Sequence, residues 1–478
     1  MNPIETPQTR CRAGIASGDI TPPVGIYHRM WGAASHERAT GVHRPLLATL
    51  LWLEPLAGDR AHGQLIVALD HCIFDKAEVD RLTAGICRTS GIVPAQVHIT
   101  TSHTHGSGLM LRSRADLPGG DLIGPYLDGV AQRLAELAPL AIQQSQPATI
   151  LYGTGRCNLA AHRDAWDQRT QQFVCGLNPT GVADDTVLVA RIIADDHKPL
   201  ATMVNYACHP TTLAWDNTSI SPDYIGALRE TIEQVSGAPC LFLQGASGDL
   251  GPREGFVGDH GVADRNGRQL AFAALAALEP LPKPGTHYVY QGPVVSGAII
   301  GAWKHEAVTP MAREGHARWQ VQQWTIDLPY RADLPTIDDA RKQEAHWKEE
   351  ENRARERGDA IGTRDCRAKV EQMTRWLARL RDLPTGVQFP FQITLWQLGD
   401  ALWLFVPGEH YQYLQTALRE QLPVRPIIVV TLTGGWLPGY LPTASTYGKG
   451  IYQESIALVA PGCLERLVEE IAGHIGRV

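Results

Sequence analysis

The chain of 478 residues is 44% hydrophobic and 19% charged, a composition typical of a globular protein with a large core. Its net charge of −7 and its pI near 6.2 argue against nucleic acid as a partner. The longest apolar stretches, residues 45–53 and 270–281, are shorter than the roughly 18 residues that a transmembrane helix needs.

The nine cysteines are scattered along the chain and form no CxxC pair. This pattern argues against a disulfide framework and against a zinc site built from thiolates. The first fourteen residues contain no apolar segment of the kind found in secretion signals. We therefore expect a cytoplasmic protein in which any metal is bound by nitrogen and oxygen. The sequence leaves the oligomeric state open, a homo-oligomer included.

Short apolar runs rich in β-branched residues recur along the chain and predict buried strands. They lie at residues 64–74, 97–103, 200–210, 238–246, 391–409 and 425–435. Helical patterns separate some of them, at 75–91 and at 221–237. In the second helix, Ser221 or Asp223 is the expected N-cap and Gly237 the expected C-cap.

The alternation of strands and helices predicts an α/β protein with a mixed β-sheet core flanked by helices. We expect residues 1–478 to form one domain, since no repeat or low-complexity linker interrupts them. Residues 336–383 differ from the rest because they are strongly charged at helical spacing, with a break near Gly358 and Gly362. They predict an inserted helical hairpin whose charges are mostly solvated, although a role in binding a partner stays open.

The segment TTSHTHGSG, residues 101–109, places His103 and His105 where a predicted strand enters a turn. On an extended chain, residues two apart point to the same face. Both imidazoles could then bind one metal ion, or one could bind while the other stays free as a base or donor. Alternatively, both could simply cap backbone groups at the end of the strand.

Further polar residues follow other predicted strands. His209 ends one of them, and Asp249 lies in the small-residue segment QGASGDLGP, where it could orient a histidine or cap a helix. Ser247 in that segment does not fit the nucleophile elbow G-x-S-x-G, because Asp249 occupies the place of the last glycine. Glu409 follows a strand and a Pro-Gly turn, and residues 434–455 form a loop dense in Gly, Pro and Tyr. Such loops at strand ends are typical places for a site in an α/β protein.

Together these stretches resemble the neutral/alkaline (non-lysosomal) ceramidase superfamily of zinc-dependent amidases. The similarity lies in SHTHGSG, CHPTT, the PGE of residues 407–409 and PGYLPT…IYQES, which occur in the order of the family's motifs. Tyr440 and Tyr452 are twelve residues apart, as in the family. The opening AGIASGDITPPVG is also similar, so the resemblance extends over roughly residues 12 to 475.

The resemblance implies four ligands for Zn²⁺, namely His103, His209, Glu409 and Tyr440. It implies that His105 acts on the substrate as a donor or base and that Tyr452 is a second active-site tyrosine. In NLAAHRDAWD, Arg163 is the best match for an arginine that faces the substrate carbonyl oxygen.

The chain also departs from the family. Gly251 occupies a position where ceramidases carry a serine implicated as a nucleophile or substrate anchor. We also expect the protein to lack the C-terminal immunoglobulin-like domain and the secretion signal of the true ceramidases. The resemblance therefore implies a stand-alone catalytic domain with the family's chemistry and a different substrate.

Two imidazoles, one carboxylate and one phenol suit zinc and leave a coordination position for water, whose pKa zinc lowers to about 7. Our hypothesis is a hydrolase for a small-molecule substrate in which this water attacks an amide (N-acyl) carbonyl. Arg163 and Tyr452 would stabilise the oxyanion, His105 would protonate the leaving amine, and Asp249 would support the site. Hydrolysis of an ester, lactone or glycosidic bond at the same site is an alternative. A non-catalytic, zinc-stabilised binding protein is another.

Overall fold

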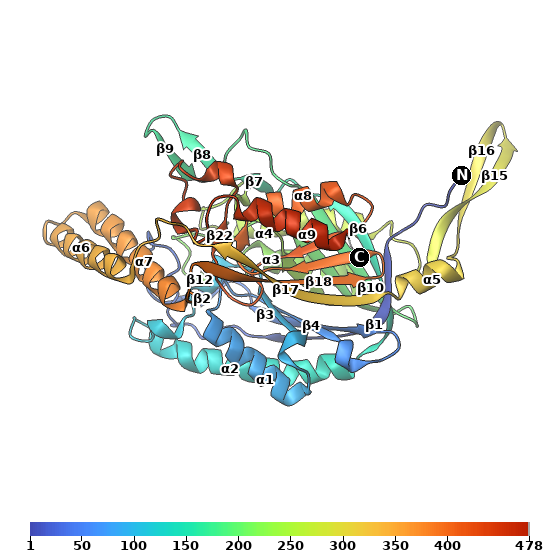
Figure 1. The fold of residues 1–478 in the computed structure, drawn as a ribbon, viewed down its shortest axis with the longest axis horizontal. Helices are drawn as coiled ribbons and strands as arrows, with labels where there is room; N and C mark the ends of the chain where they lie inside the picture. The colour runs from blue at the N-terminus through green and yellow to red at the C-terminus, as the bar shows by residue number, and fades with distance from the viewer. Residues whose placement is uncertain (477–478) are drawn as a thin grey trace.

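The computed structural model describes residues 1–476 and is built around a mixed eight-stranded sheet (Figure 1). The strands lie in the order β13-β11-β10-β6-β1-β3-β4-β5. Neighbours are antiparallel except at the two edges, where β11 pairs with β13 and β4 with β5 in parallel. In chain order the strands are Gln8–Asp19 (β1), Leu47–Pro55 (β3), Gln64–Leu69 (β4), Val97–Thr101 (β5), Gln146–Arg156 (β6), Thr186–Ala194 (β10), Pro199–Tyr206 (β11) and Cys240–Gln244 (β13).

A second, four-stranded sheet packs against one face of the first. Its strands are Trp319–Pro329 (β17), Gln388–Leu398 (β18), Ala401–Phe405 (β19) and Ile427–Val430 (β21). Leu51 and Met203 of the large sheet share one buried apolar cluster with Trp396 and Trp403 of the small sheet. The two sheets are therefore joined by a common core.

Helices cover the outer face of each sheet. Successive residues of a strand point to opposite faces, so Leu51 faces the small sheet while its neighbour Trp52 packs under α1 and α2. Similarly, Val189 packs under α3 and α4, and α8 and α9 cover the small sheet. The helices are Lys76–Ser90 (α1), Ile123–Gln143 (α2), Tyr224–Ser236 (α3), His260–Leu278 (α4), Tyr413–Gln421 (α8) and Cys463–Ile475 (α9). The predicted α/β fold with a mixed sheet flanked by helices is confirmed.

Side chains cap both α1 and α3, and the ends predicted for α3 are confirmed. The Asp75 carboxylate accepts a hydrogen bond from the N–H of Glu78 at the start of α1. For α3, Asp223 rather than Ser221 is the N-cap, and Gly237 ends the helix with φ 66°. The apolar run 391–409 contains two strands, β18 and β19, because the chain turns at Gly399 with φ 52°.

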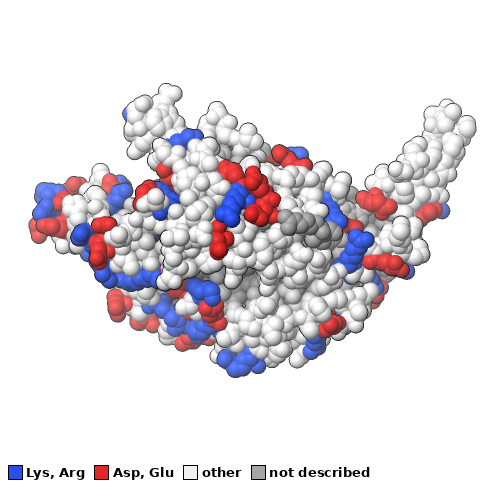
Figure 2. Space-filling model, in the orientation of Figure 1, with Lys and Arg blue, Asp and Glu red and all other residues white. Residues whose placement is uncertain are grey.

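The charged insertion forms the predicted hairpin, with helices Ile337–Glu356 (α6) and Ala360–Asp382 (α7). Its outer end projects from the body and carries interspersed acidic and basic side chains (Figures 1 and 2). Most of its charged side chains are solvated as expected, but those of Glu371 and Arg375 in α7 are only 13% and 19% exposed. Trp376 and Leu377 are buried there, and an added Cβ at Gly32 of the body would lie 2.7 Å from the Cβ of Ala368. The inner part of α7 is thus packed tightly onto the body.

The remaining elements are small. A two-stranded arm, whose tip is almost uncharged in Figure 2, projects from the opposite end of the molecule and is followed by a short helix. These are Thr286–Ser296 (β15), Ala298–Ala307 (β16) and Pro310–His316 (α5). The short strand pairs are Gly41–Val42 (β2) with Ser219–Ile220 (β12), Ala160–His162 (β7) with Leu250–Pro252 (β14), Asp164–Asp167 (β8) with Gln172–Cys175 (β9), and Glu409–His410 (β20) with Tyr440–Leu441 (β22). None of the described helices combines the length and the hydropathy that a bilayer crossing requires.

Candidate active site

The candidate metal ligands lie on loops at the carboxyl ends of strands from both sheets. His103 follows β5, His209 follows β11, and Glu409 follows β19. β5 already ends at Thr101, and His103 has a left-handed φ of 65°. The expectation that His103 and His105 point to one face of an extended strand is therefore wrong, and their ring planes are 87° apart.

Three of the four predicted ligands converge on one point. The Nε2 atoms of His103 and His209 are 3.1 Å apart. The Oε2 atom of Glu409 lies 3.2 Å from the first and 3.1 Å from the second. The Tyr440 hydroxyl lies 3.2 Å from the His209 Nε2 and completes the set.

This geometry fits a tetrahedral cation. With zinc–ligand bonds of about 2.0–2.1 Å, neighbouring ligand atoms of a tetrahedron are about 3.3 Å apart. In addition, the Nδ1 of His103 lies 2.9 Å from the Cys72 carbonyl and that of His209 lies 2.7 Å from the Ser247 carbonyl. A carbonyl only accepts, so each Nδ1 carries the proton and each Nε2 turns a lone pair to the centre.

The electrostatics of the centre favour a positive charge at this point. Burial lowers the pKa of His209 to about 3, which keeps its imidazole neutral. Burial also opposes protonation of His103, but the neighbouring Cys72 and Glu409 raise its pKa well above the ordinary value. The carboxylate of Glu409 thus lies in a buried place close to two imidazoles. This arrangement favours the binding of a cation.

A second group of candidate ligands shares His103, namely Cys72, His103 and His105. It fits less well, because the ring atom of His103 nearest to the Cys72 sulfur, at 3.7 Å, is the Nδ1 that already donates to a carbonyl. The group of His103, His209 and Glu409 is therefore the better metal centre.

Arg163 lies beside this centre. Its Nη2 donates to the Tyr440 hydroxyl at 2.9 Å and to the Gly248 carbonyl at 2.7 Å, and its Nε also faces that carbonyl. Burial raises the pKa of Tyr440, and the positive charge of Arg163 opposes that rise. The guanidinium thus favours a negative oxygen on Tyr440, and no hydrogen bond within the described chain uses its Nη1. Arg163 is also one of the residues that line the cavity above.

His105 is close to the centre but outside it. Its ring centroid is 5.0 Å from that of His103 and 5.9 Å from that of His209. Neither of its ring nitrogens has a hydrogen-bond partner among the described residues. Burial lowers its pKa well below the ordinary value, so the ring is neutral. An imidazole with both nitrogens free at the wall of a cavity is available to a substrate.

A cavity of about 450 Å³ opens over the centre. Of the predicted residues, His105, Arg163, Tyr440 and Tyr452 line it. The sequence interpretation missed two further parts of its wall, an aromatic group and the inner side of α7. The missed residues are Met30, Trp31, Gly32, Cys175, Thr211, Trp215, Phe256, Ala368, Lys369, Glu371, Gln372, Arg375, Arg379 and Ile456. The one signal for the helix was a group of large apolar residues at helical spacing within QMTRWLARLR, residues 372–381.

Asp249 is not part of the cavity wall and contacts neither metal-binding histidine. Its carboxylate accepts hydrogen bonds from the backbone and side-chain N–H groups of Gln412, and its backbone carbonyl accepts from the N–H of Arg163. It therefore ties together the loops that carry Glu409 and Arg163. Its place is that of a residue that supports the site through these two loops rather than through a histidine of the metal centre.

Neither Ser247 nor Gly251 supplies a nucleophile. The Ser247 hydroxyl is buried and accepts a hydrogen bond from the Gln244 side chain at 2.6 Å. Gly251 lies in β14 beside Arg163, where an added Cβ would meet atoms of Arg163 and Thr211 at 3.8 Å.

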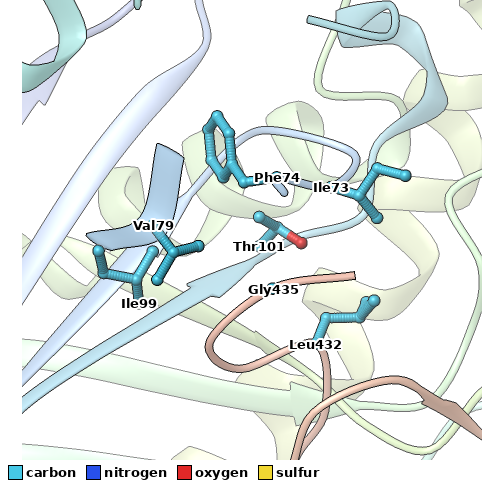
Figure 3. Close-up of a pocket in the computed structure, with 7 residues that line it drawn as sticks. All are labelled: Ile73, Phe74, Val79, Ile99, Thr101, Leu432 and Gly435. Atoms are coloured by element: carbon cyan, nitrogen blue, oxygen red, sulfur yellow. The ribbon is translucent and has the colours of Figure 1, made fainter. Parts of the chain in front are cut away.

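A separate small cavity of about 10 Å³ lies under the metal-site loops (Figure 3). Its lining is apolar apart from Thr101, so it is a packing void that lacks the polar partners a buried water needs. Ile99 of β5 and Leu432 contact it from two segments that are far apart in sequence, and the Gly434 N–H donates to the Ile99 carbonyl at 2.9 Å. These contacts hold the loop that leads to Tyr440 against β5.

Comparison with known proteins was made at the level of sequence and of structure. No family model and no curated protein matches the sequence. Among solved structures, the neutral ceramidase of Pseudomonas aeruginosa aligns over 98% of this chain and 74% of its own length, with a TM-score of 0.62 and 14% identity. The fold is that of a neutral ceramidase. A ceramidase complexed with C2 aligns over 97% of this chain and 74% of its own length, with a TM-score of 0.63 and 15% identity. The ceramidase resemblance predicted from the motifs is thus confirmed in the fold.

Proposed function

We propose that this ceramidase-like chain is a zinc-dependent hydrolase that cleaves an amide (N-acyl) bond of a small molecule. The observation that carries the proposal is the convergence of His103, His209, Glu409 and Tyr440 beneath a cavity into which the unpartnered His105 faces. The core shared by the two sheets supports the further proposal that the chain is one catalytic domain, with the hairpin as an insertion.

The four ligands would hold Zn²⁺, which when bound acts as a Lewis acid and makes water nucleophilic at neutral pH. The neutral imidazole of His105 is suited to accept a proton from the attacking water and to pass it to the leaving nitrogen. Arg163 would donate from its free Nη1 to the developing oxyanion. Tyr452 lies at the cavity wall, with its ring centroid 6.1 Å from that of Tyr440, and would donate from the other side.

The open cavity also argues against a purely structural zinc site, because a structural site is closed on all sides by protein ligands. A small molecule fits its volume of about 450 Å³, which lies within the usual range of ligand pockets.

The experiment is metal analysis of the purified protein together with turnover of N-acyl compounds, esters, lactones and glycosides. We expect about one zinc per chain, amide hydrolysis that a chelator abolishes, and recovery when zinc is added back. Hydrolysis of esters, lactones or glycosides with no amide cleavage would overturn the amide assignment. A zinc-loaded protein that cleaves none of these compounds would overturn the proposal of an enzyme.

A further inference from the structure

The cavity over the metal centre has two walls of different chemistry. One wall is aromatic, with Trp31 in edge contact with both Trp215 and Phe256 at ring distances of 6.2 and 5.6 Å. The other is formed by the inner side of α7, which contributes three basic side chains, Lys369, Arg375 and Arg379. A basic wall is unexpected in a chain with a net charge of −7 and therefore points to the ligand rather than to the bulk composition.

The single carboxylate on this wall is already neutralised. Glu371 accepts from the Arg375 Nε at 2.7 Å and from both terminal nitrogens of Arg114 at 2.9 and 2.7 Å. Arg375 is further fixed by donating from Nη2 to the Met30 carbonyl. The network therefore carries an excess positive charge and holds α7 in place at the cavity.

Arg379 lies one helical turn after Arg375 on the same face of α7. No carboxylate of the described chain lies within ion-pair distance of it, and no hydrogen bond occupies its guanidinium. Its guanidinium carbon lies 5.6 Å from the centre of the Trp436 ring, which holds the side chain without using its donors. A planar group with five free N–H donors is suited to bind a carboxylate.

The basic wall is close to the reacting centre. Burial raises the pKa of Tyr452, and the positive charges of Arg375 and Arg379 oppose that rise. The exposed Lys369, six residues before Arg375, also lines the cavity. A ligand that contacts both the aromatic group and the basic residues of α7 would thus have an apolar part and an anionic part.

We propose that the inserted hairpin selects amides with a carboxylate on the amine side, such as N-acyl amino acids, and that Arg379 binds this carboxylate. The inference rests on the proposed function for the bond that is cleaved. Water would add across the C–N bond, giving a free carboxylate from the acyl part and an amino acid whose nitrogen receives the proton. The apolar acyl group would lie against Trp31, Trp215 and Phe256.

The test uses the zinc-loaded full chain with two probes of similar shape. N-Benzoylglycine carries the carboxylate, and N-isobutylbenzamide replaces it with a neutral isopropyl group. kcat/KM and calorimetric binding are measured for the wild type, Arg379→Gln, Arg379→Lys and Lys369→Gln. The control is Arg364→Gln, which removes the same charge from α7 at an exposed position outside the cavity. Thermal unfolding shows that each variant is folded.

We expect the wild type to favour N-benzoylglycine at least tenfold in kcat/KM and in binding. Arg379→Gln should lose most of this preference, Arg379→Lys should keep part of it, Lys369→Gln should reduce it severalfold, and Arg364→Gln should keep all of it. Equal use of the two probes by the wild type, or an unchanged preference in Arg379→Gln, would overturn the inference and leave amide hydrolysis intact. Conversely, Arg379-dependent binding of N-benzoylglycine without cleavage of either probe would support the anion site and overturn the proposed amidase. Absence of both binding and cleavage would overturn both.

Discussion

Glu409 and Tyr440 stand directly opposite each other in the parallel pair of β20 and β22, and the Glu409 N–H donates to the Gly439 carbonyl at 2.8 Å. This short backbone pairing places a carboxylate and a phenol, 31 positions apart in sequence, beside the same imidazole, that of His209. A fixed backbone register holds side chains more firmly than two independent loops would. We therefore infer that the pairing of β20 with β22 completes the metal centre.

The first prediction separates metal binding from catalysis. His103→Ala should abolish both zinc binding and turnover, because its Nε2 is one of the converging ligand atoms. His105→Ala should keep about one zinc per chain and lose turnover by about 10²–10⁴-fold, the usual contribution of a general acid or base. Elemental analysis and a rate assay on the same samples provide the measurement. Equal loss of metal in the two variants would contradict this division of roles.

A second prediction concerns Tyr440. Tyr440→Phe keeps the buried ring but removes the hydroxyl that lies beside His209 and accepts from Arg163. We expect weaker zinc binding, measured by competition with a chromogenic chelator, and turnover reduced by about 10²-fold or more. Tyr413→Phe is the matched control, since this tyrosine is partly exposed and does not line the cavity. Zinc affinity that is identical in the two variants would exclude Tyr440 as a ligand.

The third prediction tests how α7 is held. Glu371→Gln removes the charge that pairs with Arg114 and Arg375, leaving two guanidinium groups with little exposure and no ion-pair partner. We expect the free energy of unfolding to fall by about 3–5 kcal/mol. If the hairpin unfolds separately from the body, the free energy of unfolding of the hairpin should fall by the same amount. Urea denaturation together with limited proteolysis of α6 and α7 measures it. Glu349→Gln, which breaks an exposed pair with Arg353, should cost about 1 kcal/mol or less. If the two substitutions cost the same, the network does not hold the helix.

The same carboxylate predicts a dependence on pH. Burial would raise the pKa of Glu371, but Arg375 and Arg114 outweigh it and lower the pKa to about 2. Because the folded-state pKa lies below the unfolded-state value of about 4.3, the stabilisation is fully present above that pH and is lost as the pH falls toward 2. The wild type should therefore lose more stability than Glu371→Gln between pH 5 and 2, as followed by acid unfolding. Parallel acid-unfolding curves for the wild type and Glu371→Gln would refute this prediction.

A fourth prediction addresses the missing serine. Gly251→Ser fits sterically, since the added Cβ meets its nearest atoms at an ordinary contact distance of 3.8 Å. We expect a change in stability within about 1 kcal/mol and turnover within about threefold of the wild type, because the proposed reaction uses water rather than a serine nucleophile. Mass spectrometry of a quenched reaction should show no acylated protein. A covalent adduct on the new serine, together with a large rise in rate, would show that the scaffold favours the serine mechanism.

The sequence by itself determined the local features of the protein. Asp223 and Gly237 cap α3 as predicted because capping depends on neighbours within one turn. The apolar runs located β4, β5, β11 and β13, since strands buried on both faces are apolar throughout. Strands such as β1 and β17 were missed, because polar residues alternate in them and they are recognisable only once their partner strands are known.

The tertiary structure decided how these parts combine. The four candidate ligands could be named from motifs, yet the strand order and the pairing of β20 with β22 place His103, Glu409 and Tyr440 each within 3.2 Å of the His209 Nε2. Likewise, the charge pattern of residues 336–383 predicted a hairpin but not which side of it would face the site. The orientation of α7 depends on contacts with distant residues, namely Arg114, Met30 and Trp436. In the orientation that these contacts fix, Arg379 lines the cavity. Local chemistry fixes caps and strands, whereas a site assembled from distant loops is fixed by the packing that joins them.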